Sequence, residues 1–152
     1  MGSTSSGTQP THTKLLPDRN VQMVKIKWCA GSYFTWLSFF YDDDSTLWFA
    51  KNAGSTGGCS EVNVPSNAVF TSACYTYNAN GHLKPRIRFY YNGGSLVVGS
   101  SSPGDTCRSV SIDGPIQGIV FQEDDTSMKW LKFLIACPYS DDTSIYAGPV
   151  YG

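Results

Sequence analysis

One short apolar pattern occurs three times in the chain, and this internal repeat constrains the fold more than any other feature of the sequence. Each copy has a large side chain, an aliphatic residue, a polar residue, a phenylalanine and a further apolar residue. The copies span residues 36–40, 86–90 and 130–134. Chains with a repeat period of about 20–50 residues are built from several copies of one supersecondary unit. The pattern therefore predicts three similar units in this chain.

The residues around each copy repeat as well. A polar turn follows each copy, then a short apolar strand in which Leu47, Leu96 and Ile145 occupy matching positions, and then a glycine-rich stretch. An apolar residue near a proline and an alternating strand precede each copy. Units of about 48 residues therefore tile the folded part of the chain. Their expected bounds are 15–59, 60–107 and 108–152.

The three units are expected to form a single domain over residues 14–152. Residues 1–13 are polar and have no apolar stretch of the kind found in a signal peptide. We therefore predict that residues 1–13 are a flexible tail.

Within a unit, the spacing of the apolar residues is that of β-strands. Residues 24–28 alternate between apolar and polar side chains, which places one face of a strand on a core. Asn92 and Gly93 lie between two such strands and predict a hairpin, because this pair accepts the positive φ of a type I′ turn. Residues 124–136 alone fit a capped helix. Their register with the other two units favours a loop followed by a strand.

Composition excludes several classes of protein. Charged residues make up 15% of the chain, against about 25% in an average soluble protein, and aromatic residues make up 14%. Disordered chains have few aromatic residues, and coiled coils are rich in charged ones. The net charge of −1 gives no general attraction to nucleic acid or to an anionic membrane. No run approaches the ~18 apolar residues of a membrane span, so no membrane insertion is expected.

These observations together predict an all-β domain that is closed or prism-like. Threefold closure protects the edges of the sheets and buries aromatic side chains on a shared axis. A β-trefoil, which also has three units, is the alternative fold.

The five cysteines include no C-x-x-C pair. Both buried thiols and one or two disulfides remain open, and the odd number leaves at least one thiol without a partner in this chain.

The first unit resembles a known family. Residues 30–37, followed by a strand, a turn, a strand and the glycine-rich residues 54–58, look like one unit of the jacalin-related lectins. Residues 123–126, the strand at 131–134 and Cys137 are similar to the repeat of vitelline membrane outer layer protein I, which shares the fold of these lectins. The resemblance implies a β-prism I fold of three Greek-key units related by a pseudo-threefold repeat.

The resemblance also implies a way of binding sugar. In these lectins a G-x-Y-x-D loop and a glycine-rich loop hold the ligand: the carboxylate accepts charge-assisted hydrogen bonds from sugar hydroxyls, and glycine amides approach closely. The tyrosine face packs on the pyranose. The loop of the first unit keeps Gly31 and Tyr33 but has Thr35 in place of the aspartate. The second unit has Pro85 at this position, and the third has Lys129.

We expect the binding site in the first unit, which is nearest to the lectin pattern. In this hypothesis Tyr33 and Phe34 pack on the ligand. Ser32 and Thr35 form hydrogen bonds with it, and glycine amides complete the pocket. The predicted ligand-binding residues are Gly31, Ser32, Tyr33, Phe34, Thr35, Gly57 and Gly58.

Other chemistries have less support in the sequence. His82 is the one credible general base, and nothing places a nucleophile beside it. The acidic runs 42–44, 123–125 and 141–142 fit turns better than a calcium site, so no metal is expected. The basic strand that contains Arg86 fits a solvated face better than a nucleic-acid site.

The sequence therefore predicts a secreted or extracellular, non-catalytic domain that needs no cofactor and binds a glycan or glycoprotein through loops at the ends of the sheets. The alternative is a structural or protein-interaction module on the same fold whose sugar sites have degenerated, as the missing aspartate would require. Homo-oligomerisation remains open, and so does a place in a larger protein.

Overall fold

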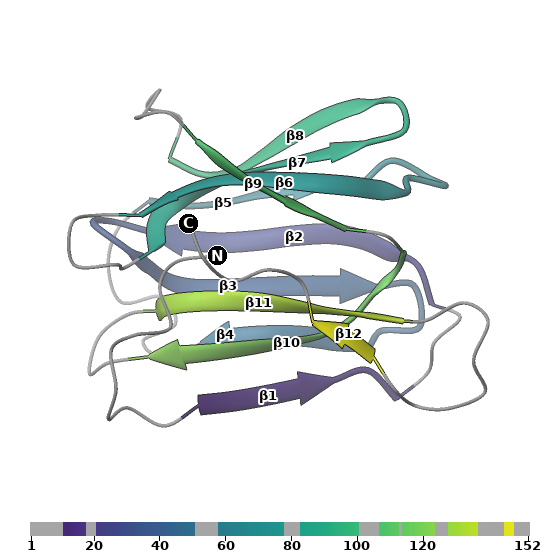
Figure 1. Ribbon diagram of the computed structural model, residues 1–152, viewed down its shortest axis with the longest axis horizontal. Helices are drawn as coiled ribbons and strands as arrows, with labels where there is room; N and C mark the ends of the chain where they lie inside the picture. The colour runs from purple at the N-terminus through teal and green to yellow at the C-terminus, as the bar shows by residue number, and fades with distance from the viewer. Residues whose placement is uncertain are drawn as a thin grey trace.

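The computed structural model describes residues 11–17, 21–50, 58–77, 83–100, 107–112, 114–123, 128–136 and 145–147. All regular structure in this part of the chain is β-strand (Figure 1). No helix that could cross a membrane occurs among these residues. The strands are β1 (Thr11–Leu15), β2 (Met23–Ala30), β3 (Phe34–Tyr41), β4 (Thr46–Ala50), β5 (Gly58–Asn63), β6 (Phe70–Tyr77), β7 (Leu83–Tyr91), β8 (Gly94–Gly99), β9 (Arg108–Ser111), β10 (Ile116–Glu123), β11 (Met128–Ala136) and β12 (Ile145–Ala147).

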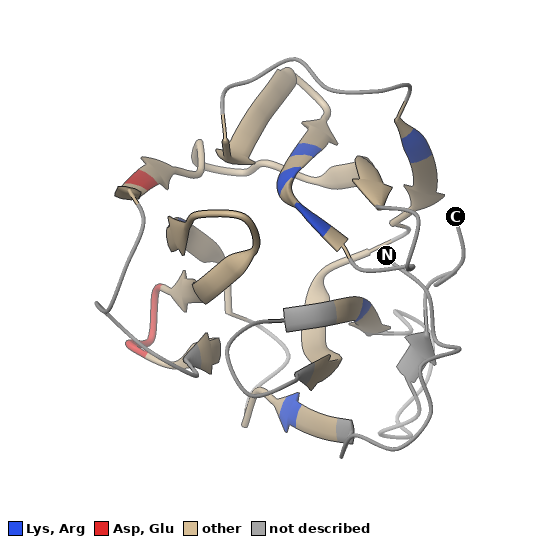
Figure 2. Ribbon diagram, turned by 90° about the vertical axis from the view of Figure 1, so that its left-hand side faces the viewer, with Lys and Arg blue, Asp and Glu red and all other residues tan. Residues whose placement is uncertain are grey.

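The strands form three four-stranded antiparallel sheets, which Figure 2 shows around a common centre. Their strand orders are β4-β3-β2-β5, β8-β7-β6-β9 and β1-β10-β11-β12. In the first two sheets, the fourth strand of the unit returns to pair with the first, which is the Greek-key order. The third sheet has the same order but takes its closing strand, β1, from the N-terminal end of the chain. The expected all-β fold with three Greek-key units is confirmed, and the trefoil alternative is not adopted.

The closing strands of the first two units extend beyond the bounds expected for those units. β5 runs to Asn63 and β9 to Ser111, beyond the expected limits at 59 and 107. Residues 11–13, expected in the tail, belong to β1 and pair with β10. The reason is burial: five of the six residues of β5 are exposed, and three of the four in β9. Such strands carry little of the apolar alternation by which a strand is recognised in sequence.

Three phenylalanines, one from each sheet, meet at the centre of the molecule. They are Phe39, Phe89 and Phe133, the phenylalanines of the three repeated patterns, and all three are buried. Their ring centroids lie 6.4, 6.0 and 5.6 Å apart. Their antiparallel partners on the first strand of each unit are Ile26, Ala73 and Ile119. The internal repeat of the sequence thus corresponds to a pseudo-threefold axis that passes through an aromatic cluster.

The ambiguous segment of the third unit is a strand. Met128–Ala136 forms β11 and pairs with β10 on one side and β12 on the other. The helix alternative is therefore wrong for this part, and residues 124–127 lie outside the described residues. The strand forms because its neighbours supply hydrogen-bond partners and bury Leu131 and Phe133, whatever the local helical tendency.

Two details of the repeat differ from expectation. Leu47 pairs with Phe39 and Leu96 pairs with Phe89. Ile145 instead pairs with Ala136, because the third unit has a longer connection before its last strand. The hairpin between β7 and β8 is confirmed, but its expected type I′ geometry is wrong, since neither central residue has a positive φ.

Two disulfides resolve the pairing of four cysteines. Cys29 is bonded to Cys59 and Cys74 to Cys107, with Cα–Cα distances of 4.0 and 5.5 Å. Each links the first strand of a unit to the start of its closing strand or to the residue just before it. Cys137 lies outside the described residues.

Candidate functional site

The expected binding loop lies at one end of the prism, between β2 and β3. Ala30 pairs with Phe34 on one side and with Gly58 on the other. Gly58, the first residue of β5, is therefore beside the loop although it is far from it in sequence. Within the loop, the backbone N–H of Gly31 donates a hydrogen bond to the carbonyl of Tyr33 at 3.0 Å. Gly57 lies outside the described residues.

Exposure divides the predicted site residues into two groups. Gly31, Ser32 and Gly58 are exposed, and Tyr33 is half-buried. These four residues present two glycines without a side chain, a hydroxyl and part of an aromatic ring at the end of the prism. The structure thus places these four residues at the same end of the prism, and their role in binding stays a prediction.

Phe34 does not belong to this surface. Only 1% of the residue is exposed, so the expectation that Phe34 packs on a ligand is wrong. Its ring lies against Gly99 at the end of β8, where an added Cβ would be 3.0 Å from the Phe34 Cζ atom. Phe34 is the first residue of β3 and faces the core, whereas its neighbour Tyr33 is half-buried in the loop. Its role is to fix the loop against the second sheet.

Thr35, the residue at the lectin aspartate position, is half-buried. Its Oγ1 donates a hydrogen bond to the carbonyl of Cys29 at 3.2 Å. The proton of this hydroxyl is thus engaged by the end of β2. The residue has a neutral oxygen where a carboxylate would accept hydrogen bonds from two sugar hydroxyls. The site therefore lacks the charge-assisted hydrogen bonds of the lectin pattern at this position.

The disulfide between Cys29 and Cys59 lies directly behind the site. Cys29 is two residues before Gly31, and Cys59 follows Gly58. The bond joins the two strands that carry the two halves of the site. Such a cross-link restricts the separation of the strands, so the exposed glycines keep their relative position.

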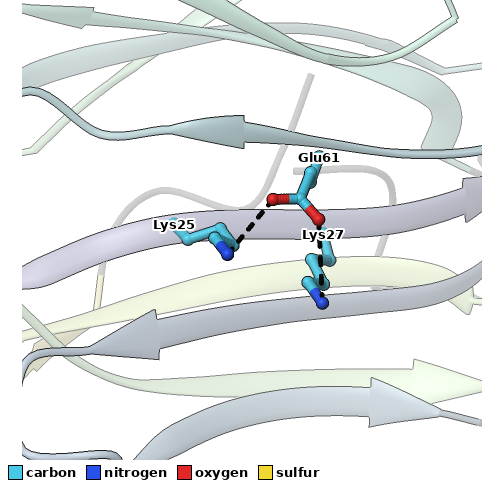
Figure 3. Close-up of polar contacts among 3 residues, drawn as sticks. All are labelled: Lys25, Lys27 and Glu61. Carbon is cyan, nitrogen blue, oxygen red and sulfur yellow. Dashed lines mark ion pairs between the residues drawn. The ribbon is translucent and has the colours of Figure 1, made fainter.

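No carboxylate near these strands replaces the missing aspartate among the described residues. Glu61 is two positions after Cys59, and its two carboxylate oxygens lie 3.1 and 3.7 Å from the Nζ atoms of Lys25 and Lys27 (Figure 3). Its hydrogen bond with Lys25 lowers the pKa of the Glu61 carboxyl from the usual value, so the group stays ionised and bound to the lysines. The acidic run 42–44 belongs to the β3–β4 turn at the opposite end of the prism.

The basic strand β7 adds one residue that the sequence did not assign to this end. The Nη1 atom of Arg86 donates to the carbonyl of Ser100 at 3.2 Å, next to the glycine on which Phe34 packs. Arg88 contacts the hydroxyl of Ser95 at 3.4 Å. Both contacts lie within one sheet, between β7 and β8 or the residue after β8. Arg86 pairs with Gly99, and Phe34 packs on Gly99 from the first sheet. This contact between sheets, which the sequence does not show, places Arg86 near the loop.

The structure shows little else that could carry chemistry. Among the described residues there is no group of three or more histidine, cysteine or acidic residues that could hold a metal ion. His82 lies outside the described residues, as do the acidic residues 124, 125, 141 and 142.

Comparison with solved structures identifies the fold. The Calsepa lectin, solved in complex with a bisected glycan, superposes with a TM-score of 0.64 at 16% identity, covering 90% of this chain and 94% of the lectin. A mannose-specific jacalin-related lectin from Morus nigra, solved with mannose, superposes with a TM-score of 0.53 at 16% identity. The match covers 88% of this chain and 97% of that lectin. This chain has the β-prism I fold of the jacalin-related lectins.

A third structure of the same fold is a prostate-specific WGA16 glycoprotein lectin. It gives a TM-score of 0.61 at 13% identity, covering 87% of this chain and 94% of that one. Sequence comparison adds nothing to this likeness: no protein-family model matches the chain, and no curated protein sequence matches it. The β-prism is therefore recognised by its geometry, as the weak but repeated sequence pattern had suggested.

Proposed function

We propose that the protein is a lectin-like domain that binds a glycan or glycoprotein without catalysing a reaction. The observation that carries this proposal is the surface formed by Gly31, Ser32 and Gly58 on a β-prism. Exposed glycines allow a ligand to approach the backbone closely, and the disulfide between Cys29 and Cys59 holds the two strands together. Solved structures with this fold include lectins in complex with a bisected glycan and with mannose.

In this proposal the roles differ from those of the lectin pattern. The hydroxyl of Ser32 forms hydrogen bonds with sugar hydroxyls, and Gly31 and Gly58, which have no side chain, let the sugar approach the backbone closely. The partly exposed ring of Tyr33 packs against the apolar C–H face of the sugar. Phe34 and Thr35 act behind the surface by fixing the loop. Binding without a carboxylate is expected to be weak for a single sugar unit, because charge-assisted hydrogen bonds are roughly twice as strong as neutral ones.

A second candidate function is a structural or protein-interaction module on the same fold. The neutral Thr35 hydroxyl, which donates to the Cys29 carbonyl, favours it, since the charged acceptor of the lectin site is missing. The two candidates differ in what the wild-type surface binds.

Thr35→Asp separates the two candidates. If the wild type binds sugar, a glycan array with folded protein gives binders, and Thr35→Asp tightens binding by about tenfold or more because it restores a charged acceptor. Thr35→Asn, of the same shape without the charge, is the control. Binding gained only in Thr35→Asp would identify a degenerate site and support the second candidate. No binding by the wild type or either variant would exclude a glycan site at this loop.

We further propose that the protein is secreted or extracellular. Two disulfides in one small domain are typical of oxidising compartments. Homo-oligomerisation stays a prediction, which sedimentation analysis of the purified protein tests directly.

A further inference from the structure

A cavity of about 470 Å³ lies at the end of the prism opposite to the loop. It is lined by three short segments, 21–23, 67–70 and 114–116, each of which ends on the first residue of the first strand of its unit, together with Tyr41. The cavity therefore lies on the pseudo-threefold axis. Its volume falls within the about 300–1,000 Å³ that is usual for small-molecule sites.

The floor and the rim of the cavity differ in chemistry. Met23, Tyr41, Phe70 and Ile116 are all buried and form the apolar floor. The ring of Phe70 lies 5.3 Å from that of Phe89, so the floor continues directly into the aromatic cluster on the axis. The rim carries the exposed side chain of Val69, 54% accessible, and two carboxamides.

The carboxamides at the rim belong to Gln22 and Asn67. No charged side chain is among the described lining residues. The cavity therefore offers apolar and aromatic surface for most of a ligand, and hydrogen-bonding groups for one polar atom at its mouth. An anionic ligand would lose hydration here without gaining a cationic partner among the described lining residues.

Each of the three wall segments is held by a hydrogen bond from another part of the fold. Asp42 and Asn92, which occupy equivalent turns, each exchange two hydrogen bonds with the backbone of a wall residue. Asp42 does so with Gln22 at 3.1 and 2.9 Å, and Asn92 with Val69 at 3.0 and 3.2 Å. The third segment is held by Tyr41, whose hydroxyl donates to the carbonyl of Ile116 at 3.0 Å.

These bonds mean that the cavity is formed before any ligand arrives. Burial raises the pKa of the Tyr41 hydroxyl, so this group stays protonated and keeps its bond to Ile116. A site whose walls are already ordered loses less conformational entropy on binding.

We propose that this axial cavity is a second ligand site, which binds a small uncharged aromatic molecule carrying one hydrogen-bond donor. The ring occupies the apolar floor beside Phe70, and the donor faces the carboxamides of the rim. The site is separate from the loop at Gly31, and its occupancy does not depend on glycan binding.

Indole is a suitable probe, and the methionines supply the readout. Met23 lines the cavity, whereas Met128 begins β11 at the opposite end of the prism. In protein labelled at the methionine methyl groups, we expect indole to shift the Met23 resonance saturably and to leave that of Met128 in place. Indole-3-acetate, the same ring with a carboxylate, should bind at least about tenfold more weakly.

Two variants that block the cavity test the location. Ala68→Phe fills it, and Val69→Trp covers its mouth from an exposed position that tolerates a larger side chain. Tyr90→Trp is the matched control, because Tyr90 is 40% exposed and does not line the cavity. Both blocking variants should weaken indole binding at least about tenfold, and the control should leave it unchanged.

Several outcomes would overturn the proposal. They are an unmoved Met23 resonance in the wild type, equal binding of indole and its carboxylate, or unchanged binding in a folded blocking variant. If Ala68→Phe fails to fold, the binding of indole by Val69→Trp and the wild-type titration still decide whether the cavity is the site. The glycan array is a separate measurement, so failure at one end of the prism is distinguishable from failure at the other.

Discussion

Two glycines at the loop end of the prism differ sharply in how well the fold tolerates a side chain in their place. Gly99 has a φ of 98°, and an added Cβ there would be 2.1 Å from the carbonyl oxygen of Pro85. Gly58 has nothing within 4 Å of an added Cβ. Both glycines lie near the candidate site, yet only Gly99 is required by the backbone. Gly58 is free to serve a ligand.

Substitution of these two glycines separates stability from binding. Gly58→Ala should change the free energy of unfolding by no more than about 0.5 kcal/mol, while glycan binding falls because the methyl group blocks close approach to the backbone. Gly99→Ala should lower stability by more than about 1 kcal/mol, since its backbone conformation and space exclude a side chain. Denaturant unfolding and the glycan array measure the two effects. Unaltered binding by folded Gly58→Ala would remove Gly58 from the site.

Among the elements, the closing strands were the hardest to predict from sequence. The repeated patterns 36–40, 86–90 and 130–134 identified a central strand of each sheet, because large apolar residues at fixed spacing must be buried somewhere. β1 and β5 carry mostly polar or exposed residues, so no periodicity distinguishes them from loops. Their place is set by hydrogen bonds to strands that are distant in sequence.

Only part of the candidate site was predictable from the sequence. Gly31, Ser32 and Tyr33 lie in a loop, and a loop motif can be read locally. The burial of Phe34 against Gly99 depends on how the first sheet packs on the second, and no local pattern contains that information. The same holds for Arg86.

Removal of β1 tests whether the N-terminal strand completes the third sheet. A chain that begins at residue 16 loses all five pairs between β1 and β10 and leaves β10 as an unprotected edge. We expect its melting temperature to fall by about 5–10 °C or more. A chain that begins at residue 11 keeps these pairs and is the control. Equal thermal stability of the two shortened chains would show that β1 does not contribute.

The contacts between β2 and β5 give a test that depends on pH. The pKa of Glu61 is lowered in the folded protein, mainly through Lys25, so its contribution is present above the unfolded pKa and is lost as the pH falls through the folded one. Glu61→Gln should therefore melt at a lower temperature than the wild type near neutral pH. The difference should vanish in strong acid. A difference that persists in acid would assign the effect of Glu61→Gln to packing instead of charge.

At the scale of the whole molecule, the three sheets share one core through Phe39, Phe89 and Phe133. Because each ring contacts the other two, the loss of one weakens the packing of all three sheets. The disulfides, by contrast, each act within one sheet. Cooperative unfolding of the three units therefore depends on the aromatic cluster at the pseudo-threefold axis.

Truncation of one axial ring should affect the entire fold at once. We expect Phe89→Ala to lower the free energy of unfolding by about 3–5 kcal/mol, the usual cost of a cavity left by a buried phenylalanine. Unfolding should remain a single transition when followed by tryptophan fluorescence and by circular dichroism. Phe40→Ala, at a half-buried position next to an axial ring, should cost less. Separate transitions for the two probes would show that the sheets unfold independently.

The pairing of β1 with β10 also orders events during protein synthesis. β1 leaves the ribosome before its partner β10, which follows about a hundred residues later. At the about 5–20 residues per second of translation, β1 waits for several seconds while the strands of the first two sheets become available to pair. The third sheet can close only when the last unit arrives and its strand β10 pairs with β1.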